Sequence, residues 1–137
     1  MMENLIYYDE IIRAEFEPSE IPWVKIFAQG EFCELSDMSK NSREYLFLCA
    51  MITEEAMREF YVPKKINHAS FANYVPRVHL HIQARFSDDS FFPESMWGKI
   101  QRKGAVRELN LANFKEILCE KFSKFHDEFW LNFKVNF

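Results

Sequence analysis

The chain has 137 residues, of which 48% are apolar and 17% aromatic, as expected for one domain with a hydrophobic core. Its net charge of -4 argues against a protein that coats nucleic acid. Three cysteines without a Cys-x-x-Cys pair argue against a disulfide framework and a cysteine-based zinc site. The longest apolar run, residues 45–52, is too short to cross a bilayer, and residues 1–9 do not resemble a signal peptide. We therefore expect a cytoplasmic protein that contacts neither membranes nor nucleic acid.

The first half of the chain predicts three short strands followed by an amphipathic helix. The expected strands are residues 5–8, 11–16 and 24–27. Ser39 and its neighbours offer N-cap side chains, and apolar residues recur at helical spacing between Tyr45 and Phe60. Pro63 prevents the helix from continuing.

The second half predicts two strands, a loop and a second helix. The strands are expected over residues 65–71 and 78–86, and the helix over about 110–126. Strands and helices are mixed without a β-α-β rhythm, which predicts a single α+β domain, residues 1–137, with an antiparallel sheet of about five strands. We expect the aromatic tail to pack on the body of the protein or on a second subunit; it contains Phe129, Trp130, Leu131 and Phe133.

Two of the four histidines lie on one face of the strand expected over residues 78–86. Alternate residues of a strand share a face, so one row of side chains points away from the core. That row is Arg77, His79, His81, Gln83 and Arg85. An ordinary sheet surface does not need so many basic, imidazole and amide groups in succession, and the row therefore predicts a working face.

The charge around this strand has one sign. The segment of residues 64–86 contains Lys64, Lys65, Arg77 and Arg85 but no acid, although the whole chain has 21 acids and 17 bases. A positive neighbourhood beside imidazoles suits an anionic substrate such as a phosphate ester. The Asp88-Asp89 pair that follows is interpreted as a solvated turn.

Three interpretations of His79 and His81 remain open at this point. The pair has no function, or it binds a metal together with His68, or one imidazole attacks phosphorus while its neighbours bind the phosphate. Metal-binding histidines are usually oriented by carboxylates or carbonyls, and Arg77 would put a fixed positive charge beside the ion. We therefore expect no metal and no cofactor, and we favour the third interpretation, which uses all the observations.

The segment of residues 72–85 resembles the motif of the histidine triad superfamily, His-φ-His-φ-His-φ-φ, where φ is apolar. Ala72 stands where the family has Gly in the loop before the motif, and Arg77 stands where it has its first histidine. The resemblance extends to residues 19–27, 65–70 and 92–98, which are similar to a short bacterial branch of the family.

This resemblance implies an α+β fold, a homodimer, and the cleavage or transfer of nucleoside monophosphates. The substrates would be dinucleoside polyphosphates, nucleoside phosphoramidates or nucleotide sugars, and no metal is implied. His79 would be the nucleophile that forms a covalent nucleotidyl-histidine, with its other ring nitrogen oriented by the backbone carbonyl of residue 77. His81 would contact the phosphate. The residues expected to bind substrate are Asn67, Asn73 and Gln83.

Two departures from the family pattern leave alternatives open. Arg77 cannot shuttle protons near pH 7, so the protein is alternatively a nucleotide-binding regulatory module with little catalysis. The residues 79–83 also fit His-x-His-x-Gln, the pattern of a nucleotidylyltransferase branch, which would make His81 the nucleophile. The flanking Asn73, Pro76 and Arg85 favour His79.

Overall fold

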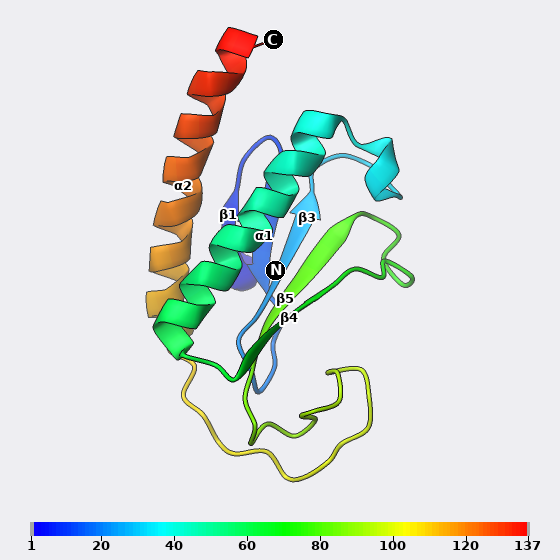
Figure 1. Ribbon diagram of the computed structural model, residues 1–137, viewed down its shortest axis with the longest axis vertical. Coiled ribbons are helices and arrows are strands. Elements are labelled where there is room, and N and C mark those ends of the chain that lie inside the picture. The colour runs from blue at the N-terminus through cyan, green and yellow to red at the C-terminus, as the bar shows by residue number, and fades with distance from the viewer. Residues whose placement is uncertain (1, 137) are drawn as a thin grey trace.

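In the computed structural model, residues 2–136 are described, with the side chains of residues 3–129. Five strands form one antiparallel sheet in the order β1-β2-β3-β5-β4 (Figure 1). They are β1 (Leu5–Tyr8), β2 (Ile12–Phe16), β3 (Trp23–Ala28), β4 (Lys65–Ala69) and β5 (His79–Arg85). The five predicted strands are confirmed, and each end lies within two residues of the expected one.

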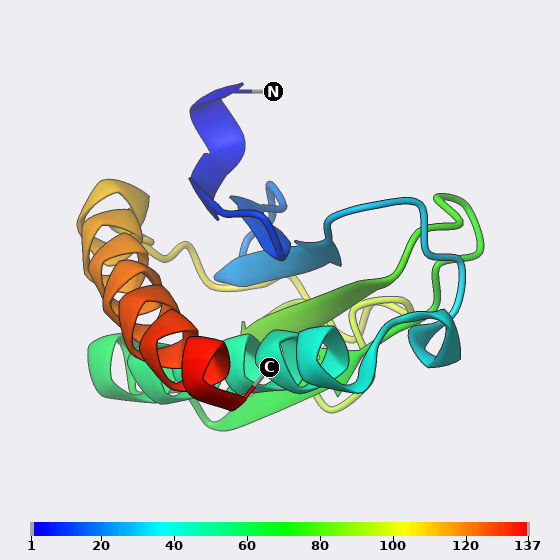
Figure 2. The same ribbon diagram turned by 90° about the horizontal axis from the view of Figure 1, so that it is seen from above.

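Two antiparallel helices cover the same face of the sheet (Figures 1 and 2). Helix α1 (Lys40–Tyr61) packs on β3 and β5, and α2 (Leu111–Asn136) packs on β1 and α1. Ser39 caps α1, since its side chain accepts a hydrogen bond from the Ser42 N–H at 3.1 Å. Neither helix carries an apolar stretch of the length needed to cross a bilayer, as far as residues 2–136 are concerned.

Helix α2 continues to Asn136 and not merely to about residue 126, because no Gly or Pro follows that would end it. In the expected aromatic tail, the ring of Phe129 packs 4.9 Å from that of Tyr45, so this residue lies on the body of the protein. The side chains of Trp130, Leu131 and Phe133 lie outside the described residues.

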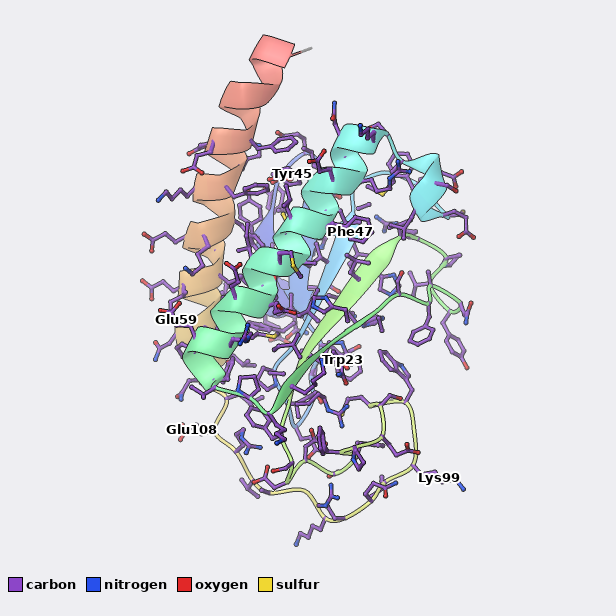
Figure 3. The ribbon with its side chains drawn as sticks, viewed as in Figure 1. Trp23, Tyr45, Phe47, Glu59, Lys99 and Glu108 are labelled. Atoms are coloured by element: carbon purple, nitrogen blue, oxygen red, sulfur yellow. The ribbon has the colours of Figure 1, made fainter. Side chains whose placement is uncertain are left out.

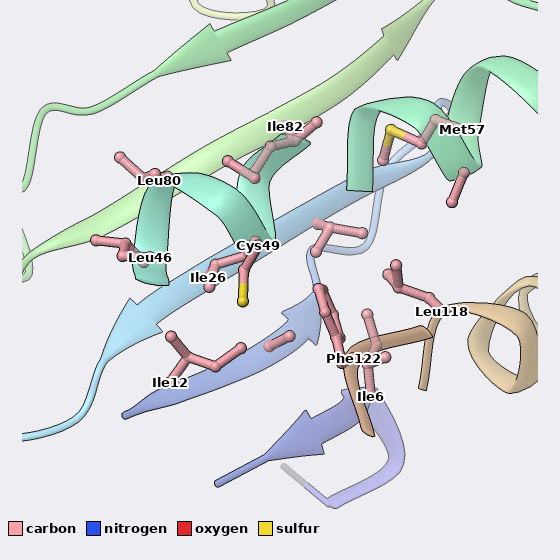
Figure 4. Packing of buried hydrophobic residues seen from close by; sticks show 14 of the residues in the cluster. Ile6, Ile12, Ile26, Leu46, Cys49, Met57, Leu80, Ile82, Leu118 and Phe122 are labelled. Carbon is pink, nitrogen blue, oxygen red and sulfur yellow. The ribbon is translucent and has the colours of Figure 1, made fainter. Parts of the chain in front are cut away.

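The hydrophobic core lies between the sheet and the helices (Figure 4). Alternate residues of β3 and β5 face the helices, which confirms the predicted core face of β5; this face consists of Leu80, Ile82 and Ala84, with Val78 just before the strand. Buried and half-buried residues alternate along β3, whereas every residue of β5 is buried. The second face of β5 is therefore covered too, and what covers it determines where a site can lie.

Candidate functional site

A cavity of about 400 Å³ opens on the sheet face opposite the helices. Both histidines of β5 line it, which confirms that they share a face. The remaining lining residues come from β3, from Glu17 before it and from two loops, and four of them are aromatic: Phe27, Phe71, Tyr74 and Trp97. The combination of an apolar hollow with a few polar groups at its floor is typical of small-molecule sites.

Two contacts orient the ring of His79, and a third holds its backbone. Its Nδ1 lies 2.7 Å from the backbone carbonyl of Arg77, and its ring stacks on Phe27 with 4.6 Å between ring centres. The Ser70 hydroxyl donates to the carbonyl of His79 itself at 3.0 Å. Because a carbonyl only accepts, Nδ1 must carry the proton, and in the neutral ring Nε2 has a free lone pair.

His81 has the opposite arrangement. The indole N–H of Trp23 donates to its Nδ1 at 3.0 Å, so the proton of the neutral ring lies on Nε2. Burial, followed by the charges of His79 and Lys25, lowers the pKa of His81 to about 4. His81 is therefore a neutral hydrogen-bond donor at neutral pH.

Trp97 closes one side of the cavity. Its ring lies 5.0 Å from that of His81, 5.3 Å from that of Trp23 and 4.9 Å from that of Phe71, each time edge to face. Trp23 itself begins β3 (Figure 3). Trp97 belongs to the long segment after β5, so this segment must be fixed in place for the wall to exist.

Asp89 fixes that segment, and the interpretation of residues 88–89 as a solvated turn was wrong for this residue. Its carboxylate is fully buried and accepts two hydrogen bonds from Arg85, at 2.9 and 3.0 Å. It also accepts from the backbone N–H groups of Phe86, Phe91 and Phe92. Burial opposes ionisation, but Arg85 and the backbone donors outweigh it and hold the pKa of Asp89 at about 2.

Several predicted site residues lie away from the cavity wall. Asn67 accepts a hydrogen bond from Arg85 at 2.9 Å. Gln83 is buried and lies between its two partners on the neighbouring strands, Trp23 on β3 and Asn67 on β4. Arg77 is exposed, with its guanidinium 5.8 Å from the ring centre of Phe27. Of the three residues expected to bind substrate, Asn73 lines the cavity, whereas Asn67 and Gln83 do not.

The prediction that four basic residues place positive charge beside the histidines was wrong for three of them: Lys64, Lys65 and Arg85. Arg85 is neutralised by Asp89, which lies outside the acid-free segment in sequence. Lys64 and Lys65 line a separate hollow beside Glu54. Among the described residues, the positive group that lines the cavity is Lys25, which pairs with Glu15 at 3.5 Å and at 3.4 Å with Glu17, itself a lining residue.

The main residues that sequence reasoning missed lie on β3. Trp23, Lys25 and Phe27 alternate with Val24 and Ile26, which are buried in the core. That alternation was visible in the sequence and, combined with strand pairing to β5, would have placed them beside the histidines. Within the part of the chain that is described, no group of three His, Cys, Asp or Glu side chains is arranged to hold a metal ion.

The sequence matches no protein-family model and no curated protein. Among solved structures, a histidine triad protein from Bradyrhizobium japonicum has a TM-score of 0.72 and 23% identity, over 88% of this chain and 92% of that one. One from Marinobacter aquaeolei has a TM-score of 0.70 and 23% identity, over 88% and 93%. One from Sinorhizobium meliloti has a TM-score of 0.68 and 16% identity, over 90% of each chain.

Proposed function

Since this chain has the histidine triad fold, we propose that it binds a nucleoside phosphate derivative in the cavity and hydrolyses it or transfers its nucleotidyl group. The observation that carries the proposal is the hydrogen bond between His79 Nδ1 and the Arg77 carbonyl. It leaves the lone pair of Nε2 free in a ring that lines the cavity, which is what a nucleophile needs.

The reaction begins when His79 Nε2 forms a bond to the α-phosphorus. The bond from phosphorus to the leaving group breaks, and the leaving group departs with that electron pair. The ring then carries positive charge, and its Nδ1–H keeps the Arg77 carbonyl as partner. Water next attacks phosphorus, the phosphorus–nitrogen bond returns its electrons to His79, and the water loses a proton to solvent; another acceptor in place of water gives transfer.

The contacts of the two rings support His79 over His81 as the nucleophile. Among the described residues, no backbone carbonyl bonds to His81; its Nδ1 accepts from Trp23, so its Nε2 presents a proton and not a lone pair. His81 Nε2–H instead donates to a phosphate oxygen, where charge develops in the transition state. The aromatic wall of Phe71, Tyr74 and Trp97 stacks on the base.

Arg77 favours a second candidate function, a nucleotide-binding module with little catalysis. Its guanidinium stays charged and cannot give a proton to a leaving group near pH 7.

We also propose that the protein acts as a homodimer. This is supported by apolar side chains left exposed on α1: Phe47 (Figure 3), Leu48 and Met51 are 46%, 38% and 43% exposed.

The experiment that separates the two functions is a search for the covalent intermediate. The protein is mixed with a fluorogenic adenosine phosphoramidate or with the p-nitrophenyl ester of AMP, quenched with acid-free denaturant, and analysed by mass spectrometry, first intact and then after digestion. A mass increase of one adenylyl group on the peptide containing His79 supports the enzyme. Nucleotide binding in a parallel titration without any adduct would support the module instead.

A further inference from the structure

Trp23 makes a directional contact with His81 that packing alone does not require. An indole N–H can only donate, so its 3.0 Å contact with His81 Nδ1 requires a lone pair on that atom. We propose that Trp23 is a positioning residue that holds His81 in the tautomer with its proton on Nε2. The role of this proton in the reaction rests on the function proposed above.

The two histidines then present complementary atoms to one phosphate. Their ring centres lie 4.9 Å apart, and both rings line the cavity. The Arg77 carbonyl forces the proton of His79 onto Nδ1, whereas the Trp23 indole forces the proton of His81 onto Nε2. One Nε2 therefore offers a lone pair to phosphorus, and the other offers an N–H to a phosphate oxygen.

The surroundings of His81 keep the ring neutral, so that the tautomer matters. Burial is the main cause of its lowered pKa, followed by the charges of His79 from β5 and Lys25 from β3, and the ring of Trp97 from the following loop also faces it. A protonated His81 would also turn an Nδ1–H against the indole N–H, donor against donor. The hydrogen bond from Trp23 thus opposes protonation as well as the second tautomer.

Trp97 provides a matched comparison for Trp23. Its ring contacts the same imidazole edge to face at 5.0 Å, close to the 5.7 Å of Trp23. Within the described residues, however, its indole donates no hydrogen bond to His81. Replacement of each tryptophan by phenylalanine removes similar ring area, but only Trp23→Phe removes a donor to Nδ1.

The test is ¹⁵N NMR of the histidine rings in the full chain, without ligand, at pH 7. In the wild-type protein, we expect His81 to show an unprotonated Nδ1 and a protonated Nε2. In Trp23→Phe, both signals shift toward the average of two tautomers, and the pKa of His81 rises, while burial and the charges of His79 and Lys25 keep it below 6.5. In Trp97→Phe, the Nδ1 signal stays that of an unprotonated nitrogen.

Formation of the adenylyl adduct supplies the second measurement. We expect Trp23→Phe to lower the single-turnover rate of adduct formation about tenfold. This is less than the roughly 100-fold cost of losing an oxyanion donor, because a fraction of the His81 rings keeps its proton on Nε2. Unchanged His81 signals in folded Trp23→Phe, or a proton on Nδ1 in the wild-type protein, would overturn the assignment of Trp23. Expected ring signals without any adduct in the wild-type protein would count against the nucleotidyl transfer alone.

Discussion

One end of a single strand face is open to a cavity, whereas the other end is sealed. His79 and His81 line the cavity, while Arg85, four residues after His81 on the same face, is 1% exposed beneath the segment of residues 86–110. The alternation of the backbone makes these residues neighbours, but it does not decide which of them a ligand can reach. Access to Arg85 is blocked because Asp89 binds it and anchors the covering segment above it.

The comparison predicts that the open end carries chemistry. We expect His79→Ala to lower the rate of adduct formation at least about 1,000-fold, because no other ring in the cavity offers a free Nε2 lone pair. His81→Ala should cost about 100-fold, the loss of one donor to the phosphate. Both rates come from rapid-quench measurements followed by intact mass analysis. Adduct that persists in His79→Ala would make His81 the nucleophile.

The sealed end should carry stability. Asp89→Ala leaves the guanidinium of Arg85 buried without its partner, and we expect the free energy of unfolding to fall by about 3–5 kcal/mol. The neighbouring Asp88 is exposed and pairs with Arg107 at the surface, so Asp88→Ala should cost at most about 1 kcal/mol. Urea unfolding measures both. Equal losses in the two variants would show that the carboxylate of Asp89 does not anchor the loop.

The sequence predicted the backbone of this site better than its surroundings. Strand ends, the core face of β5 and the shared face of the two histidines follow from local periodicity, and they are confirmed. The pairing of Arg85 with Asp89 was missed, because a turn of two acids after a strand is indistinguishable from a solvated one until the loop is closed. Periodicity describes one element at a time, whereas burial depends on what a distant segment covers.

The neutral state of His81 should appear in the pH dependence of stability. Its pKa is about 4 in the folded protein and 6.5 in an exposed ring, so the unfolded chain binds a proton first as the pH falls. Stability from this residue is full above pH 6.5 and is lost from 6.5 to 4, with a slope of up to about 1.4 kcal/mol per pH unit. In urea unfolding at several pH values, His81→Gln should lack that slope. Parallel pH curves for the two proteins would contradict the low pKa.

Arg77 is the residue on which the two proposed functions differ. Its replacement by His adds a group that can give a proton near pH 7, so Arg77→His should speed the release of poorly acidic leaving groups about 10- to 100-fold. Leaving groups that depart as stable anions should be affected little. Single-turnover rates for AMP esters of phenols of different acidity measure this. Equal rate changes across the series would mean that residue 77 does not assist departure.

The smallest expected effect concerns the loop at the open end. Ala72 has a φ of +54°, a left-handed conformation that costs an L residue roughly 1–2 kcal/mol. Ala72→Gly relieves this cost but adds about 0.4–1 kcal/mol of chain entropy to the unfolded state, so we expect a net gain of about 0.5–1 kcal/mol in urea unfolding. Ala69→Gly is the matched control, because Ala69 lies in β4 with extended backbone and should lose about 0.5–1 kcal/mol. A loss in both variants would mean that residue 72 does not hold this conformation in solution, and that the open edge of the cavity differs from the one described.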